Sequence, residues 1–310
     1  MNEKKHYVRK PLEEMNVIDD FLFTAIMSDE EDGLEVCRMI LSCVLKREIG
    51  NIKFTVQKIV QGASEDSHGI RMDVYVTEEA GDRINVYDVE PDKQSSKKAL
   101  LPKRSRYYGD LIDKQLLESG NDYDKLPELV TIFILSYDPF GKNAMYYEAG
   151  TVLKTHPDVL YNDGIRRIFL YVDGDLPDEA DTEEQKLKNL LRYINESIEG
   201  NATDDNTRKL DSIVKKTKAK KDVGISYMKS WEREREIREE GRAEGLAEGL
   251  EKGIVQERII LIQRKIRKGK TLDAIVDELE STAEEIMPIY ETVMKHPKDA
   301  DPGEILKDLL

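Results

Sequence analysis

The sequence RMDVYV at residues 71–76, followed by INVYDVE at residues 84–90, decides the fold. Both segments place β-branched or aromatic residues on a period of two, which is typical of strands. Residues 78–82 between them (EEAGD) are polar and contain Gly81, so they predict a turn. The two segments are therefore expected to form a β-hairpin.

Each predicted strand of this hairpin carries a carboxylate, Asp73 on the first and Glu90 on the second. A carboxylate buried in a sheet is costly unless something pairs with it, and Mg²⁺ held by two carboxylates and waters is one solution. The pattern predicts a metal-dependent hydrolase with Asp73 and Glu90 as metal ligands. The alternative is a pair of solvated carboxylates near a sheet edge.

A series of motifs follows along the chain: Asp73, VYDVE at 86–90, LPKRSRYY at 101–108, VTIFIL at 130–135, DPFG at 138–141, Tyr146 and Tyr147, NDG at 162–164, and the closing Glu-Gly repeats. This order of motifs resembles the PD-(D/E)xK nuclease family transposases, which are also called recombination-promoting nucleases. The resemblance covers nearly the whole chain. It implies an endonuclease that hydrolyses DNA phosphodiester bonds with Mg²⁺, with Mn²⁺ as the alternative ion, and that promotes recombination.

The resemblance also implies roles for single residues. Asp73 matches the metal-binding Asp of the second core strand, and Glu90 matches the acidic residue of the third. Two positions later the superfamily has Lys and this branch usually has Gln, but here the residue is Asp92, followed by Lys93. An acceptor-only side chain cannot replace a donor that orients water or neutralises the transition state.

Asp92 and Lys93 are therefore included with Asp73 and Glu90 as candidate catalytic residues, and two functions stay open. If Lys93 supplies the missing charge, a bulge or strand end is required, because neighbouring side chains on a strand point to opposite faces. If it does not, the chain is a catalytically degenerate family member that acts as a DNA-binding or protein-interaction module.

The net charge of the chain does not favour DNA as a partner, but the distribution of its charges does. The net charge is −15, which argues against non-specific coating of nucleic acid. Residues 93–106 nevertheless contain six cations and no acid. Within this run, Lys103, Arg104 and Arg106 are the candidate phosphate contacts, since a guanidinium fork matches phosphate geometry. The alternative for such a run is a solvated face, and a second run lies at residues 215–221.

Periodicity predicts an α/β fold. Helical spacing covers residues 11–46, strands are expected near 53–60, 70–76 and 84–90, a helix near 101–118, and strands near 129–135 and 165–172. This order matches the restriction-endonuclease-like core, a mixed β-sheet flanked by helices, followed here by an α-helical C-terminal extension. The expected domains are residues 1–175 for the nuclease-like core, 176–235 for a helical extension and 236–310 for a glycine-repeat helix and helical hairpin.

The last of these domains contains an internal repeat. Gly241, Gly245, Gly249 and Gly253 recur every four residues. Four glycines inside a helix cost about 4 kcal/mol relative to alanine. Because small residues on one ridge let another helix approach closely, self-association is one explanation, and a charged linker helix is the other. The acidic helical hairpin that follows is interpreted as a packing or dimerisation segment rather than as a DNA-reading helix-turn-helix.

Other classes of protein have no support in the sequence. Cys37 and Cys43 lie six residues apart in an apolar helical segment and are expected to be reduced core residues. The four histidines are scattered, so zinc is not expected. The chain has no run of eighteen apolar residues, and no apolar segment of a signal peptide follows its N-terminal residues, so a cytoplasmic location without membrane contact is expected.

Overall fold

The computed structural model describes residues 10–60, 70–80, 83–117, 122–297 and 299–309. The chain divides into two compact units, residues 1–228 and 229–310. The domain boundaries expected after residues 175 and 235 stay predictions.

The first unit is built on a six-stranded mixed sheet in the order β1-β2-β3-β4-β6-β5, which confirms the predicted fold class. β1, β2 and β3 form an antiparallel meander, β3, β4 and β6 run parallel, and β5 is antiparallel to β6. The strands are β1 (Ile52–Val60), β2 (Ile70–Ala80), β3 (Arg83–Asp92), β4 (Glu128–Leu135), β5 (Tyr146–Ala149) and β6 (Ile165–Tyr171).

The predicted hairpin corresponds to β2 and β3. The turn of this hairpin is shorter than predicted, because Glu78 and Glu79 belong to β2 and pair with Asn85 and Ile84 of β3. Gly81, the glycine of the predicted turn, lies outside the described residues.

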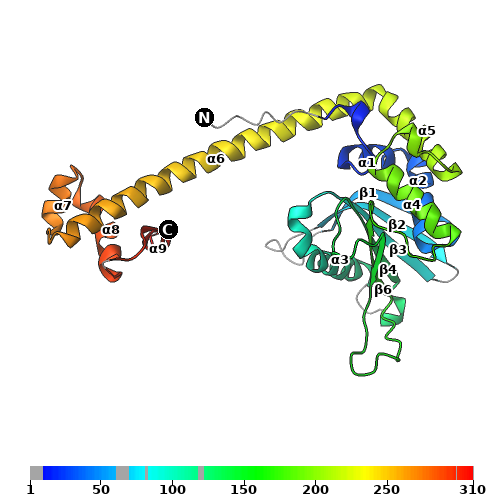
Figure 1. Ribbon diagram of the computed structural model, residues 1–310, viewed down its shortest axis with the longest axis horizontal. Coiled ribbons are helices and arrows are strands. Elements are labelled where there is room, and N and C mark those ends of the chain that lie inside the picture. The colour runs from blue at the N-terminus through cyan, green and yellow to red at the C-terminus, as the bar shows by residue number, and fades with distance from the viewer. Residues whose placement is uncertain (1–9, 61–69, 81–82, 118–121, 298, 310) are drawn as a thin grey trace. The chain divides into compact units, whose positions relative to one another are not determined.

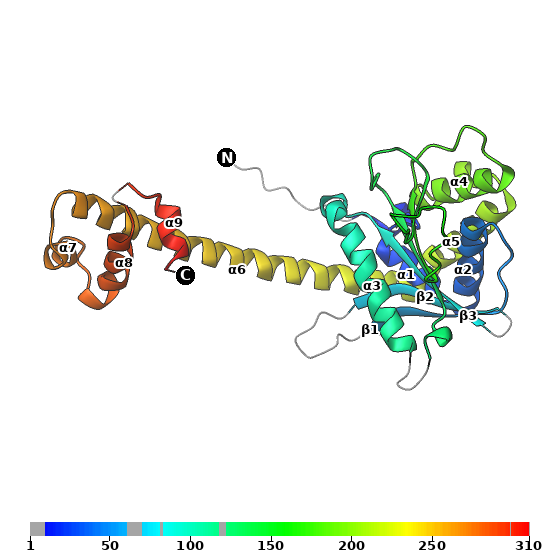
Figure 2. The same ribbon diagram turned by 90° about the horizontal axis from the view of Figure 1, so that it is seen from below.

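Helices cover both faces of the sheet. α3 lies on one face, and α1, α2, α4 and α5 lie on the other (Figures 1 and 2). The helices are α1 (Asp20–Met27), α2 (Glu30–Leu45), α3 (Leu101–Leu116), α4 (Thr182–Asn195), α5 (Asp205–Ala219), α6 (Lys221–Arg267), α7 (Leu272–Glu278), α8 (Ala283–Lys295) and α9 (Pro302–Lys307), with short 3₁₀ helices η1 (Leu12–Glu14), η2 (Ser95–Leu100), η3 (Tyr123–Lys125) and η4 (Glu199–Asn201).

Two hydrophobic layers follow from the alternation of side chains along the strands. On β3, Tyr87 and Val89 belong to the main core, which also includes Leu190 of α4 and Leu210 of α5. Val86 belongs to the opposite layer, formed with residues of α3. Since Asp88 and Glu90 follow Val86 at intervals of two, their side chains face the layer that α3 covers.

The second unit is helical. Its core joins the end of α6 to the last three helices through the buried residues Ile259, Ile275, Ile286 and Ile305. The repeated glycines lie within the 47-residue helix α6, and a Cβ added at any of them would meet nothing within 4 Å. In the described part of the chain, no helix combines the length and the apolar character that crossing a membrane requires.

Candidate functional site

Asp73 and Glu90 lie side by side on neighbouring strands. The register pairs Val74 with Val89, which makes Asp73 and Glu90 the next pair along the hairpin. The backbone N–H of Asp73 donates to Oε1 of Glu90 at 2.8 Å, and this bond fixes the direction of the Glu90 carboxylate. The structure therefore brings the two predicted metal ligands together, while their role as ligands stays a prediction.

The backbone is irregular around Asp73. On the β1 side, Val74 pairs with Val56 and Met72 with Lys58, so the regular pairing skips Asp73 and Gln57. Gln57 has a φ of 51°, in the left-handed region that glutamine rarely adopts. Strained backbone inside a strand is concentrated at functional sites.

Asp88 is a third carboxylate at this site, and sequence reasoning missed it. Its side chain is fully buried, and within the described part of the chain its oxygens have no hydrogen-bond partner other than the carboxyl group of Glu90. Burial, followed by the charge of Asp73, raises the pKa of Asp88 to about 7, and the hydrogen bond with Glu90 opposes this shift. Burial also raises the pKa of Glu90, with added repulsion from Asp88 and Asp73. The group should therefore retain a proton near neutral pH.

Helix α3 lies over the face of the sheet that carries these carboxylates. Tyr108 on α3 has its pKa raised to about 12, first by burial and then by the charge of Glu90. The charges of Asp88 and Asp73 act on Tyr108 in the same direction. The three carboxylates thus share the face of the sheet that α3 covers.

Asp92, the departure from the family pattern, has its own set of partners. Its Oδ2 accepts from Nη2 of Arg104 at 2.6 Å and from the hydroxyl of Tyr137 at 3.0 Å. Its Oδ1 accepts from the backbone N–H of Gln94 at 2.7 Å. The carboxylate is buried and satisfied, so Asp92 acts as an anchor for these groups.

Arg104 is the cation that this anchor holds beside the carboxylates. It comes from α3, and its guanidinium carbon lies 5.2 Å from the centre of the Phe133 ring. Burial lowers the pKa of Arg104, but the charges of Asp92 and Glu90 outweigh burial and raise it. In return, the positive charge of Arg104 opposes the upward pKa shifts of Asp88 and Glu90.

Lys93 lies elsewhere. Its ammonium group pairs with Asp19, the residue before α1, at 2.5 Å. The side chain of Asp19 also binds Lys10 at 2.6 Å. The cation beside the buried carboxylates is therefore Arg104, and the catalytic role expected for Lys93 stays a prediction that the geometry does not favour.

The two basic runs are used differently. Lys103 and Arg106 are exposed on α3, and within the described residues neither is in an ion pair. In the second run, by contrast, Lys215 pairs with Asp211, Lys216 with Asp32 and Lys220 with Asp29. Lys103 and Arg106 of the first run therefore present positive charge to solvent, whereas Lys216 and Lys220 of the second run join α5 to α2.

The donors at this site suit a hard cation with few protein ligands. In the part of the chain that the structure describes, no group of three or more His, Cys, Asp or Glu side chains is arranged to hold a metal ion. Mg²⁺ is typically held by one or two carboxylates and several waters, so Asp73 and Glu90 are sufficient in number and kind. Apart from Glu90, the buried oxygens of Asp88 have no hydrogen-bond partner within the described chain.

The comparison with protein families assigns the chain. The model of the PD-(D/E)XK nuclease family transposases matches residues 17–243. The chain belongs to this family. No curated protein and no solved structure gives a significant match. Nucleases of this kind generally use divalent metal ions and act on DNA. The match covers all six strands and the five helices that surround them.

The site residues that sequence reasoning missed left only weak signals. Asp88 stands two positions before Glu90, so the strand period alone places both on one face. The role of Arg104 as the partner of Asp92 joins residues from a strand and a helix, and no local pattern contains that pairing. Tyr137 reaches Asp92 from 45 positions later in the chain.

Proposed function

We propose that this family member is a Mg²⁺-dependent DNA endonuclease, and that its cutting of DNA promotes recombination. The observation that carries the proposal is the group of Asp73, Asp88 and Glu90 on one face of the sheet, in which burial raises the pKa values of Asp88 and Glu90, and the oxygens of Asp88 have no hydrogen-bond partner other than Glu90 among the described residues. Acidic groups in this state are characteristic of functional sites rather than of structural ion pairs.

In this proposal Asp73 and Glu90 hold the ion. When bound, Mg²⁺ would lower the pKa of a water molecule and neutralise charge on the scissile phosphate. The N–H of Asp73 keeps Glu90 in position. Asp88 and Glu90 give up their shared proton when the cation arrives, because a nearby positive charge favours the ionised carboxylate.

Arg104 takes the role that Lys or Gln has at the position of Asp92. Asp92, which also accepts a hydrogen bond from Tyr137, holds the guanidinium near the carboxylates, where it stabilises negative charge on the phosphate. Lys103 and Arg106 on the exposed side of α3 contact neighbouring phosphates and position the duplex. The departure at residue 92 thus exchanges a donor on the strand for a donor on the helix.

The experiment is plasmid nicking with Mg²⁺. We expect Asp73→Asn to abolish nicking without loss of thermal stability, because removing one charge from a crowded acidic site relieves repulsion. Glu79→Gln is the matched control, since it removes a charge from an exposed position on the same strand. Undiminished nicking by Asp73→Asn would remove Asp73 from the mechanism.

The second candidate function is a degenerate module that binds DNA or protein without cutting, and it is favoured by the acceptor at residue 92. Nicking and DNA binding by a small set of variants distinguish the two proposals. If wild type, Asp73→Asn and Asp92→Gln are equally inactive with Mg²⁺ and Mn²⁺ from pH 6 to 9 while DNA binding persists, the module is the better account.

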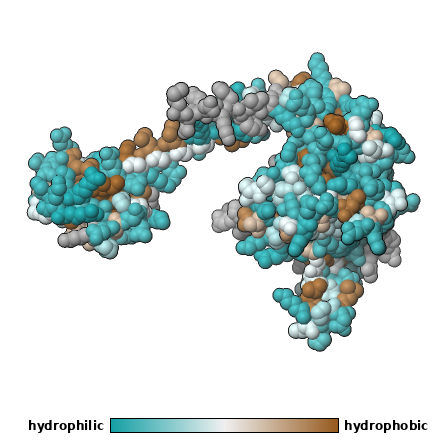
Figure 3. Space-filling model, in the orientation of Figure 1, coloured by the Kyte–Doolittle hydropathy of each residue, from teal (hydrophilic) through white to brown (hydrophobic). Residues whose placement is uncertain are grey.

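Self-association through α6 is a further part of the proposal. Leu246, Leu250 and Ile254 are each at least half exposed and follow the glycine ridge at four-residue spacing, and brown hydrophobic patches interrupt the surface of this helix (Figure 3). A leucine ridge beside a glycine groove is self-complementary between two helices. Analytical ultracentrifugation should show a dimer that Leu250→Glu dissociates and Ile237→Glu, at an exposed position outside the repeat, does not.

A further inference from the structure

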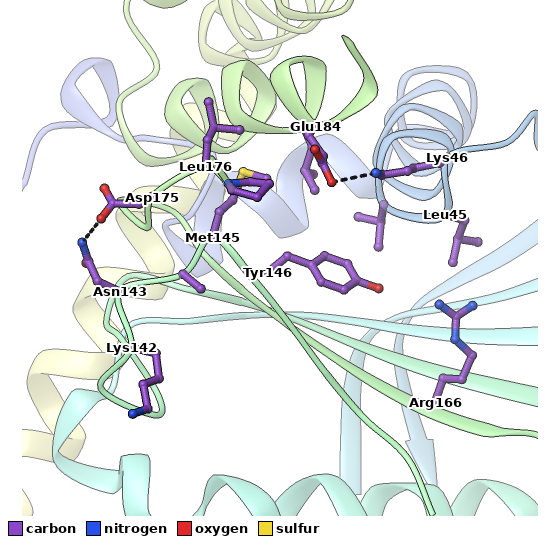
Figure 4. Close-up of a pocket in the computed structure, with 14 residues that line it drawn as sticks. Leu45, Lys46, Lys142, Asn143, Met145, Tyr146, Arg166, Asp175, Leu176 and Glu184 are labelled. Atoms are coloured by element: carbon purple, nitrogen blue, oxygen red, sulfur yellow. Dashed lines mark hydrogen bonds and ion pairs between the residues drawn. The ribbon is translucent and has the colours of Figure 1, made fainter. Parts of the chain in front are cut away.

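A separate cavity lies on the other side of the sheet from the carboxylates. Its volume is about 550 Å³, within the range of roughly 300–1,000 Å³ typical of small-molecule sites. It is lined by the end of α2, residues 142–146 before and within β5, residues 175–177 and the start of α4 (Figure 4).

The inner wall of this cavity is apolar. Val44, Met145 and Leu187 are buried members of the main core, and Tyr146 and Leu176 pack against them. In Figure 4, Tyr146 lies between the end of α2 and the loop that carries Asn143. Core side chains that line an open cavity leave apolar surface for a ligand to cover, at about 25 cal/mol per Å².

The rim is polar and already ordered. Lys46 pairs with Glu184 at 2.9 Å and with Asp181 at 3.0 Å, which ties the end of α2 to the start of α4. On the sheet side, Arg166 pairs with Glu148 at 2.7 Å. These pairs fix the walls of the cavity before any ligand binds, which reduces the entropy lost on binding.

One lining cation has no acidic partner. Of the three cations in the lining, Lys46 pairs with Glu184 and Asp181, and Arg166 pairs with Glu148. Lys142 is the third, and among the described residues it has no carboxylate within ion-pair distance. An anionic group on a ligand would find its partner at this end of the cavity.

We propose that this cavity binds a small amphipathic anion: an aromatic or branched aliphatic group with one carboxylate, sulfonate or phosphate. The apolar group lies against Tyr146 and Leu176, and the anionic group lies at Lys142. The site is separate from the proposed nuclease site, since its apolar wall belongs to the core that α2 and α4 cover.

The test uses a pair of fluorescent probes on the full chain. 8-Anilinonaphthalene-1-sulfonate has the proposed chemistry, and N-phenyl-1-naphthylamine is nearly the same molecule without its charge. We expect Leu176→Trp to fill the cavity and weaken both probes by about tenfold or more. Leu160→Trp, which adds the same indole to a residue that is 86% exposed, is the control and should leave both unchanged.

Lys142→Gln tests the charge. It should weaken the sulfonate probe by about threefold to tenfold and leave the neutral probe unchanged, because one partly exposed charge is lost. Lys154→Gln, at an exposed lysine outside the cavity, is its control. Equal effects of Lys142→Gln on both probes, or none on either, would overturn the assignment of the anion.

The position of the probe is checked by NMR of methyl-labelled methionine. The Met145 methyl signal should shift on addition of either probe, and the shift should disappear in Leu176→Trp. If both probes bind while the Met145 signal stays in place, or if Leu176→Trp and Leu160→Trp behave alike, the probes bind elsewhere and the proposal is wrong. Neither readout depends on DNA cleavage, so the proposed nuclease function can fail without affecting this result.

Discussion

The hairpin of β2 and β3 contains two buried acidic sites with opposite properties. At one end, Glu78 accepts two bonds from Arg47, at 2.8 and 2.6 Å, and one from the hydroxyl of Tyr87 at 2.6 Å. These bonds, with that of Arg47 the largest influence, lower the pKa of Glu78 to about 2. At the other end, burial raises the pKa values of Asp88 and Glu90.

We interpret this difference as the difference between a structural carboxylate and a functional one. Burial raises the carboxylate pKa at both sites, but at Glu78 the hydrogen bond from Arg47 outweighs it, while at Asp88 and Glu90 burial is the largest influence. Glu78 has partners for both oxygens, whereas the oxygens of Asp88 have none among the described residues other than the carboxyl group of Glu90. Because a buried carboxylate is normally satisfied, we propose that the one left without a donor on this hairpin is available to a ligand.

The largest expected difference between the two acidic sites is in nicking activity. Glu90→Gln should reduce Mg²⁺-dependent nicking by about 10³-fold or more, since metal-ion catalysis supplies several kcal/mol. Glu78→Gln should leave the nicking rate of the folded protein unchanged. Plasmid nicking at a temperature well below both melting transitions measures the two. Equal losses of activity would mean that the contrast has no functional meaning.

For the free energy of unfolding we expect the opposite order, with the larger loss in Glu78→Gln. Glu78→Gln should lower the free energy of unfolding by about 2–3 kcal/mol, because hydrogen bonds to a charged group are lost in a buried site. The loss is smaller than for a fully buried pair because Arg47 stays partly in water. Glu90→Gln should change stability little or increase it. Urea denaturation at pH 7 gives both values, and a less stable Glu90→Gln would contradict the account.

The dependence of stability on pH should also differ in sign between the sites. The pKa of Glu78 is depressed in the folded state, so its contribution is present above the unfolded value and is lost as pH falls toward 2. The pKa of Asp88 is raised to about 7, so the folded state binds more protons than the unfolded state between about pH 4 and 7. Stability contributed by Asp88 therefore falls as pH rises through this window.

Asp88→Asn tests that sign. We expect the loss of stability between pH 5 and pH 8 to shrink by roughly 1–4 kcal/mol in the variant, since one pKa unit corresponds to about 1.4 kcal/mol. Asp158→Asn, at an exposed loop position, is the control. Parallel stability curves for wild type and Asp88→Asn would show that Asp88 does not titrate in this range.

The smallest effect concerns the two basic runs. Replacing Lys103 and Arg106 together by Gln should reduce the slope of log K against log salt by about 2 for duplex DNA, as each lost phosphate contact removes about 0.9. The same replacement at Lys215 and Lys216, which pair with Asp211 and Asp32, is the matched control. Fluorescence anisotropy at several salt concentrations measures the slopes, and equal slopes for the two variants would mean that α3 does not contact DNA.

Much of the fold follows from local sequence patterns. The alternation at residues 71–76 and 84–90 predicted β2 and β3, and the largely apolar run at residues 130–135 predicted β4. Strand β5 was missed because it has only four residues, Tyr146–Ala149, and pairs at the sheet edge. The turn was predicted to begin at Glu78 because Glu78 and Glu79 are polar. In the structure both belong to β2, and the ion pair of Glu78 with Arg47 explains how the strand accommodates an acid.

The site was predictable only in part, for a related reason. Asp73 and Glu90 could be found because the hairpin register is local. Asp92 could be recognised as a departure, but its partner Arg104 lies on a helix, and the resulting ion pair depends on tertiary packing. Lys93 was expected to supply charge to the site, and its contact with Asp19 depends in the same way on where α1 begins.

The most direct measurement of the central claim is a crystal structure of the protein soaked with Mn²⁺ and recorded at a wavelength where manganese scatters anomalously. The account predicts an anomalous peak in contact with the carboxylates of both Asp73 and Glu90, and its disappearance in Glu90→Gln crystals soaked in the same way. A peak bound only by other residues, or carboxylates of Asp73 and Glu90 on opposite faces of the sheet, would contradict it.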